Sequence, residues 1–149
     1  MGFVLRSICD IKVGDFITCW GDQEVPADVV LIYCSGDSAF VDTTNLDGEM
    51  VIKEKIPVLE GYGHNKLMGH IGLLKCTQPN PILENWSGSI VFHNINYKQK
   101  ISLETKNFLL RGSCLKSTDY IVGLVTYVGA DTKIQMHGRS AKVKWSWLL

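Results

Sequence analysis

A mainly β fold is predicted for this chain by three features of its sequence. Its 149 residues fit one domain with a single core. Fourteen glycines and four prolines separate many short runs of Val, Ile, Tyr and Phe, a pattern typical of strands joined by turns. A composition with 46% hydrophobic and 20% charged residues excludes a disordered chain.

The expected strands follow one another with turn-rich spacers between them. They are residues 16–20, 29–34, 39–44, 71–76, 89–92, 97–103, 108–112 and 121–128. The continuous apolar run 29–34 indicates a strand that is buried on both faces. Asp131 is placed to cap a short helix from Thr132. Residues 54–72 give a mixed signal, either a short helix or an irregular excursion, and no domain boundary is visible.

The net charge is zero, but the charges are unevenly distributed. No acid follows Asp131, so the last seventeen residues carry +4 and the rest of the chain carries −4. The basic residues of this segment are Lys133, Arg139, Lys142 and Lys144, and it ends in tryptophans and leucines. It is either a solvated tail or the approach to a membrane span. No apolar run is long enough to cross a bilayer, and no signal peptide or lipid anchor is expected at residues 1–9.

Binding sites of common types are not predicted. The five cysteines are odd in number and widely spaced, which favours reduced, mostly buried thiols over zinc ligands. The four histidines have no metal-ligand spacing, and no glycine-rich phosphate loop is present. The balanced charge also argues against nucleic acid as a partner. We therefore expect no cofactor and no metal in this domain.

One short polar segment could carry chemistry. Asp47-Gly48-Glu49 follows a predicted strand and puts a carboxylate beside a flexible backbone. Taken alone, the tripeptide is more typical of a solvated turn than of an active site.

The neighbouring residues favour a functional interpretation of this segment. Residues 13–15, 25–32 and 42–49, which read Val-Gly-Asp, Val-Pro-Ala-Asp-Val-Val-Leu-Ile and Asp-Thr-Thr-Asn-Leu-Asp-Gly-Glu, resemble the actuator domain of P-type ATPases. Asn-Leu-Asp-Gly-Glu is the form of the type IV class, the phospholipid flippases, whereas cation pumps have Thr-Gly-Glu. Segments 80–83, 86–88, 107–113, 118–123 and 129–133 also resemble flippase segments in the family's order, so that the resemblance covers about residues 10–144.

The resemblance implies a fold and a location. It implies a distorted jelly roll, or double-stranded β-helix, with one or two short helices, inserted between the second and third membrane helices on the cytosolic face of a membrane. Residues 1–149 would form a single actuator domain. Residues 133–149 would be its basic juxtamembrane segment, where positive charge is expected.

The resemblance also implies roles for the residues of the loop. Glu49 would orient or deprotonate the water that attacks an aspartyl phosphate on a separate phosphorylation domain. Gly48 would let the backbone approach the phosphoryl group, Asp47 would shape the turn, and Asn45 and Met50 would support the loop. The chain lacks the Asp-Lys-Thr-Gly motif that becomes phosphorylated, so the isolated domain is not expected to hydrolyse ATP.

The cofactors and partners implied for the full-length protein lie outside this domain. They are ATP and Mg²⁺, the phosphorylation and nucleotide-binding domains of the same chain, membrane lipids, and a non-catalytic glycoprotein subunit.

One departure from the family leaves further functions open. The family has Thr after the glutamate, and this chain has Met50, whose thioether cannot replace a hydroxyl hydrogen bond. A turnover-deficient, ATPase-like unit fused to a guanylyl cyclase, as in some protist proteins, would fit such a loop. The actuator of a cation or polyamine pump and a stand-alone β-barrel binding module are also compatible with the sequence.

Overall fold

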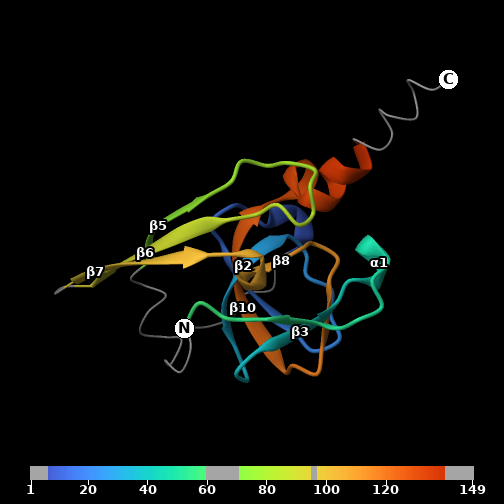
Figure 1. Cartoon of the computed structure of the whole chain (residues 1–149), viewed down its shortest axis with the longest axis horizontal. Helices are drawn as coiled ribbons and strands as arrows, with labels where there is room; N and C mark the ends of the chain where they lie inside the picture. Colours follow the sequence, from blue (N-terminus) through green and yellow to red (C-terminus); the bar gives the residue numbers. More distant parts are fainter. Residues whose placement is uncertain (1–6, 60–70, 95–96, 140–149) are drawn as a thin grey trace.

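The computed structural model describes residues 7–59, 71–94 and 97–139 and builds them mainly from strands (Figure 1). All strand pairs in this part of the chain are antiparallel. The strands form three sheets, ordered β1-β10-β2-β8, β4-β3-β9 and β5-β6-β7. The predicted mainly β fold is therefore confirmed.

The strands are mostly short, as the turn-rich sequence predicts. Their bounds are β1 Phe16–Trp20, β2 Asp28–Cys34, β3 Ala39–Asp42, β4 Lys53–Lys55, β5 Ile71–Cys76, β6 Gly88–Asn94, β7 Tyr97–Leu103, β8 Phe108–Leu109, β9 Cys114–Lys116 and β10 Tyr120–Tyr127. One α-helical turn, α1, covers Thr44–Asp47, and single 3-10 turns cover Ile8–Asp10, Thr105–Asn107 and Gly129–Asp131. Residues 133–139 form a further helix.

Strand β2 lies between two hydrophobic cores. Val29 and Leu31 pack with residues of β3, β9 and β10 in one core. Val30 and Ile32 pack with residues of β6, β7 and β8 in the other. Because successive side chains of a strand point to opposite faces, this position requires an unbroken apolar run, and the expectation that residues 29–34 are buried on both faces is confirmed.

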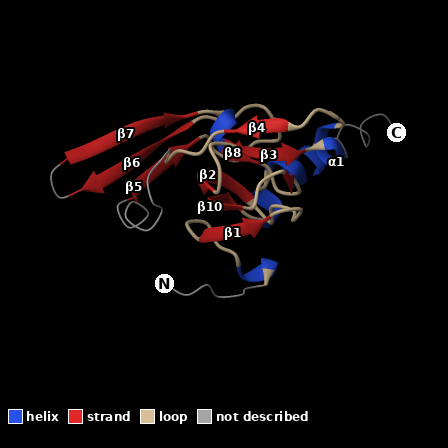
Figure 2. Cartoon of the chain, turned by 90° about the horizontal axis from the view of Figure 1, so that it is seen from below, coloured by secondary structure: helices blue, strands red, loops and turns tan. Residues whose placement is uncertain are grey.

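The third sheet stands apart from the rest of the domain. Figure 2 shows β5, β6 and β7 projecting from one side, while α1 lies toward the opposite end. The second core reaches this sheet through Ile90, Phe92 and Leu103. Helix α1 and the projecting part of this three-stranded sheet are therefore at different ends of the molecule.

Three local predictions were wrong. Residues 43 and 44 do not extend β3, because the chain turns into α1 immediately after it. The predicted strand 108–112 ends at Leu109, and the turn that follows leads into β9, which was not predicted. The C-terminal helix begins at Lys133, not at Thr132, and Thr132 holds the extended backbone of a capping position in place of Asp131.

The mixed segment and the basic tail are only partly described. Residues 53–55 form β4, and residues 60–70 lie outside the described residues. Lys133 is fully buried, so the first lysine of the basic segment faces the domain interior. Residues 134–139 of the predicted juxtamembrane segment continue the helix that begins at Lys133, and residues 140–149 lie outside the described part. No helix of the described residues is long and apolar enough to cross a membrane.

Candidate functional site

The Asp47-Gly48-Glu49 segment is held in a defined shape by α1 and the residues around it. The helical turn ends at Gly48, whose φ of 75° is left-handed and is readily adopted by glycine. The Asp47 carboxylate accepts hydrogen bonds from the Glu49 N–H at 2.9 Å and from the Thr43 hydroxyl at 3.1 Å. Asp47 thus stabilises the turn that presents Glu49.

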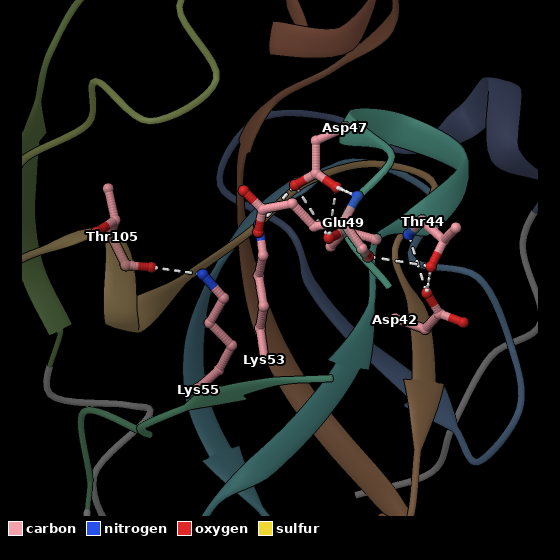
Figure 3. A network of polar contacts seen from close by, with 8 residues as sticks. Asp42, Thr44, Asp47, Glu49, Lys53, Lys55 and Thr105 are labelled. Carbon is pink, nitrogen blue, oxygen red and sulfur yellow. Dashed lines mark hydrogen bonds and ion pairs between the residues drawn. The ribbon is translucent and has the colours of Figure 1, made fainter. Parts of the chain in front are cut away.

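Lys53 links the two carboxylates of the loop (Figure 3). Its Nζ lies 2.5 Å from Asp47 Oδ2 and 3.0 Å from Glu49 Oε2. Burial, the largest single effect, opposes the charged forms of both Asp47 and Lys53. The combined contacts with Lys53, the Glu49 N–H and Thr43 nevertheless lower the pKa of Asp47, and the combined contacts with Asp47 and Glu49 raise the pKa of Lys53. The Glu49 side chain remains 50% exposed, which leaves carboxylate surface open to water.

Lys55 is a second lysine on the same face of β4, two residues further on. Its Nζ donates a hydrogen bond to the Thr105 carbonyl at 2.9 Å. Burial and the nearby charge of Lys53 lower the pKa of Lys55 to about 8, against a weaker opposing effect of Asp47. The two lysines therefore differ, because the pKa of Lys53 is raised and the pKa of Lys55 is lowered to about 8.

These side chains line a pocket of about 890 Å³. Its polar wall comes from α1, β4 and the turn between them, with Glu49, Lys53 and Lys55. Residues 81–84 form part of the lining from a distant region of the sequence, and Phe108 and Leu110 add apolar surface. The pocket thus places an accessible carboxylate beside a mixed polar and apolar cavity.

The remaining predicted site residues support the loop to different degrees. Asn45 Nδ2 donates to the Gly112 carbonyl at 3.3 Å, which ties α1 to the turn after β8. Met50 is 85% exposed and thus contributes little packing to the loop. The Thr44 hydroxyl donates to Asp42 Oδ1 at 2.6 Å and lies 3.1 Å from the Glu49 carbonyl.

Sequence reasoning missed Lys53, Lys55 and the 81–84 segment. The spacing of the two lysines is the signal that could have found the first two, because residues i and i+2 of a strand share a face. Segment 80–83 resembles the family in sequence, but nothing in the sequence places residues 81–84 at the pocket, since only the tertiary fold brings them there.

The site has the features of a proton-accepting or water-orienting carboxylate. Glu49 can accept a hydrogen bond from water while Lys53 fixes its orientation. Among the described residues, no group of three or more His, Cys, Asp or Glu side chains could hold a metal ion.

Comparisons with known proteins identify the relatives of this chain. No protein-family model matches it. It is 31% identical to the human phospholipid-transporting ATPase VD over 98% of this chain and 10% of that protein. It is 34% identical to the human phospholipid-transporting ATPase ID over 91% of this chain and 11% of that protein.

A third relative is a guanylate cyclase of Toxoplasma gondii, 32% identical over 84% of this chain and 3% of that protein. The chain thus spans about a tenth of the length of the ATPases that it matches, and less of the cyclase. The similarity to the ATPases covers nearly all of this chain, including the Glu49 loop, the pocket and both cores. The chain therefore belongs, as a domain-sized segment, to the type IV P-type ATPases, the phospholipid-transporting ATPases.

Proposed function

We propose that this chain is the actuator domain of a phospholipid-transporting ATPase and that Glu49 acts in dephosphorylation. In the full-length protein, the loop would be presented to an aspartyl phosphate on a separate domain. Glu49 would accept a hydrogen bond from the attacking water and align it with the phosphorus–oxygen bond that breaks. Such general-base assistance typically contributes about 10²- to 10⁴-fold to a rate.

The observation that carries this proposal is the way in which Glu49 is presented. Its backbone is fixed by Gly48 and by the carboxylate of Asp47, while its own carboxylate is half exposed and oriented by Lys53. The Asp47 carboxylate accepts from the Glu49 N–H and the Thr43 hydroxyl, as Asp does in many turns. The feature that favours a role for Glu49 is its half-exposed carboxylate at the pocket, paired with Lys53.

Formation of the aspartyl phosphate from ATP would take place in other domains of the parent protein. This chain contains no Asp-Lys-Thr-Gly sequence, so ATP and Mg²⁺ would act on the phosphorylation and nucleotide-binding domains. Phospholipid movement between leaflets would follow from coupling to membrane segments, with this domain on the cytosolic face. The basic segment 133–149 would lie near that membrane surface.

The experiment is a phosphoenzyme decay measurement on the full-length parent protein with Glu49→Gln. The amide cannot take a proton from water, so we expect phosphoenzyme to accumulate and to decay at least about 100-fold more slowly. Glu54→Gln is the matched control, because Glu54 is exposed on β4 and bonds Ser38 outside the pocket. Normal decay in the Glu49 variant would exclude this role.

A second candidate is a regulatory unit that has lost turnover. Met50 and the similarity to the Toxoplasma gondii guanylate cyclase favour it. In the same assay, Met50→Thr should accelerate phosphoenzyme decay if the missing hydroxyl limits it. If the unmodified parent forms no phosphoenzyme at all, the regulatory candidate replaces the catalytic one.

A further inference from the structure

Lys133 is a buried cation that the proposed chemistry does not use. Its side chain is 0% exposed. Its Nζ donates to the Asn85 carbonyl at 2.8 Å, the Ile82 carbonyl at 2.9 Å and Asn80 Oδ1 at 2.9 Å. An ammonium group has three N–H donors, so these three bonds account for all of them. The Asn80 carbonyl lies slightly further away, at 3.5 Å.

The acceptors around Lys133 are neutral oxygens, not carboxylates. Among the described residues, no acidic side chain forms an ion pair with it within 4.0 Å. Burial lowers the pKa of Lys133, and the more distant charge of Asp28 partly opposes that shift. Burying an ammonium is costly unless its donors are satisfied, so the shape of segment 80–85 and the position of Lys133 depend on each other.

The main chain of Lys133 is fixed as firmly as its side chain. Its N–H donates to Asp28 Oδ2 at 2.7 Å, and Asp28 is fully buried at the start of β2. The other oxygen of Asp28 accepts the Arg111 N–H at 2.8 Å. Lys133 therefore starts from an anchored point in the central sheet and extends its ammonium into the loop.

Segment 80–85 is also part of the Glu49 pocket. Residues 81–84 line it together with Glu49, Lys53 and Lys55. His137, one turn after Lys133 on the same helix, has its Nδ1 3.1 Å from the Pro81 carbonyl. The helix 133–139 thus contacts the pocket lining at two points.

We propose that Lys133 is a positioning residue, an internal cation that organises segment 80–85 as the wall of the Glu49 pocket and fastens this wall to helix 133–139. A displacement of the helix would then move the wall relative to Glu49. The inference concerns the pocket and does not require that Glu49 assists hydrolysis, so the two proposals can fail separately.

The test is amide hydrogen exchange, followed by NMR, on the 149-residue chain with Lys133→Ala. We expect exchange of the Ile82 and Asn85 amides, which donate to Asn80 Oδ1 and to the Ile82 carbonyl, to accelerate about tenfold or more, since Lys133 no longer holds these same acceptors in place. Amides of β2 and β10 should keep their protection, and the Glu49 signal should shift. Lys106→Met, on an exposed lysine, controls for the loss of one positive charge.

Adding small ammonium ions to the Lys133→Ala variant shows whether the N–H donors of Lys133 are needed or only its volume and charge. Propylammonium matches the atoms that Lys133→Ala removes and should restore slow exchange of the Ile82 and Asn85 amides. Tetramethylammonium carries the same charge without N–H donors and should not. Equal rescue by both ions, or exchange of these two amides that stays unchanged in the variant, would overturn the proposal.

A second variant covers the case in which Lys133→Ala does not fold. Asn80→Ala keeps the lysine and removes Asn80 Oδ1, which accepts from Lys133 Nζ at 2.9 Å and also from the Ile82 N–H at 3.1 Å. The Ile82 amide loses its own acceptor in this variant, so the role of Lys133 is read at the Asn85 amide, whose exchange should accelerate by a smaller factor than in Lys133→Ala. A uniform loss of protection across β2, β10 and the loop would instead assign Lys133 to general stability and refute a specific role at the pocket.

Discussion

The charge state of Lys55 gives a prediction that can be worked from the structure. Burial and the proximity of Lys53 lower the pKa of Lys55 from its ordinary 10.5 to about 8. Below pH 8 the amine is protonated in both the native and the unfolded chain. Between about pH 8 and 10.5 the unfolded chain binds more protons than the native one, so the free energy of unfolding rises with pH.

The size of the effect follows from the two pKa values. The full difference between 10.5 and about 8 corresponds to about 3.5 kcal/mol, at about 1.4 kcal/mol for each pKa unit. Solvent that reaches the pocket screens this penalty. We therefore expect a gain of about 1–2 kcal/mol in the wild-type free energy of unfolding across this interval, relative to a variant without the amine.

Urea denaturation of the wild type and of Lys55→Met at several pH values from 7 to 10.5 measures this quantity. The difference between the two free energies of unfolding should change in favour of the wild type as pH rises through 8. Lys106→Met removes an exposed positive charge and controls for the change in net charge. Parallel pH profiles for the wild type and Lys55→Met would refute the argument.

Two further predictions concern the core. Gly123→Ala would put a Cβ 2.8 Å from a methyl carbon of Val29 on the neighbouring strand, so we expect a loss of about 1–3 kcal/mol, seen as a lower urea midpoint. Thiol labelling of the native chain should modify exposed Cys9 first. Burial raises the pKa of Cys19 to about 11 and also raises that of Cys34, so both should react only on unfolding; rapid labelling of all five thiols in native buffer would contradict this.

The strands that could be predicted are those whose own residues carry a recognisable strand pattern. Strand β2 is recognisable because it is apolar on both faces, and β5 and β7 were predicted with the bounds that the structure has. Strand β4 consists of Lys53, Glu54 and Lys55, and no propensity favours a strand there. It forms because β3 offers an edge to pair with. The sequence alone does not contain that partner's position.

The candidate site divides in the same way. Glu49, Gly48 and Asp47 are contiguous, so a resemblance could propose them; the structure shows the turn that they form, and their roles stay a prediction. Lys133 could not be predicted as an internal residue, because a lysine in a basic segment is ordinarily solvated. Its burial depends on oxygens from segment 80–85, which lies far away in sequence. Contacts of this kind depend on tertiary structure.

The pairing of β10 with both β1 and β2 has a consequence for how the chain folds. Phe16 pairs with Leu124, and Val30 pairs with the same residue from the other side. The central sheet can therefore form only after residue 124 has been synthesised. The chain loses the conformational entropy of bringing these distant segments together before most of the contacts of the sheet have formed. During synthesis, β1 and β2 would therefore lack their shared neighbouring strand until β10 has left the ribosome.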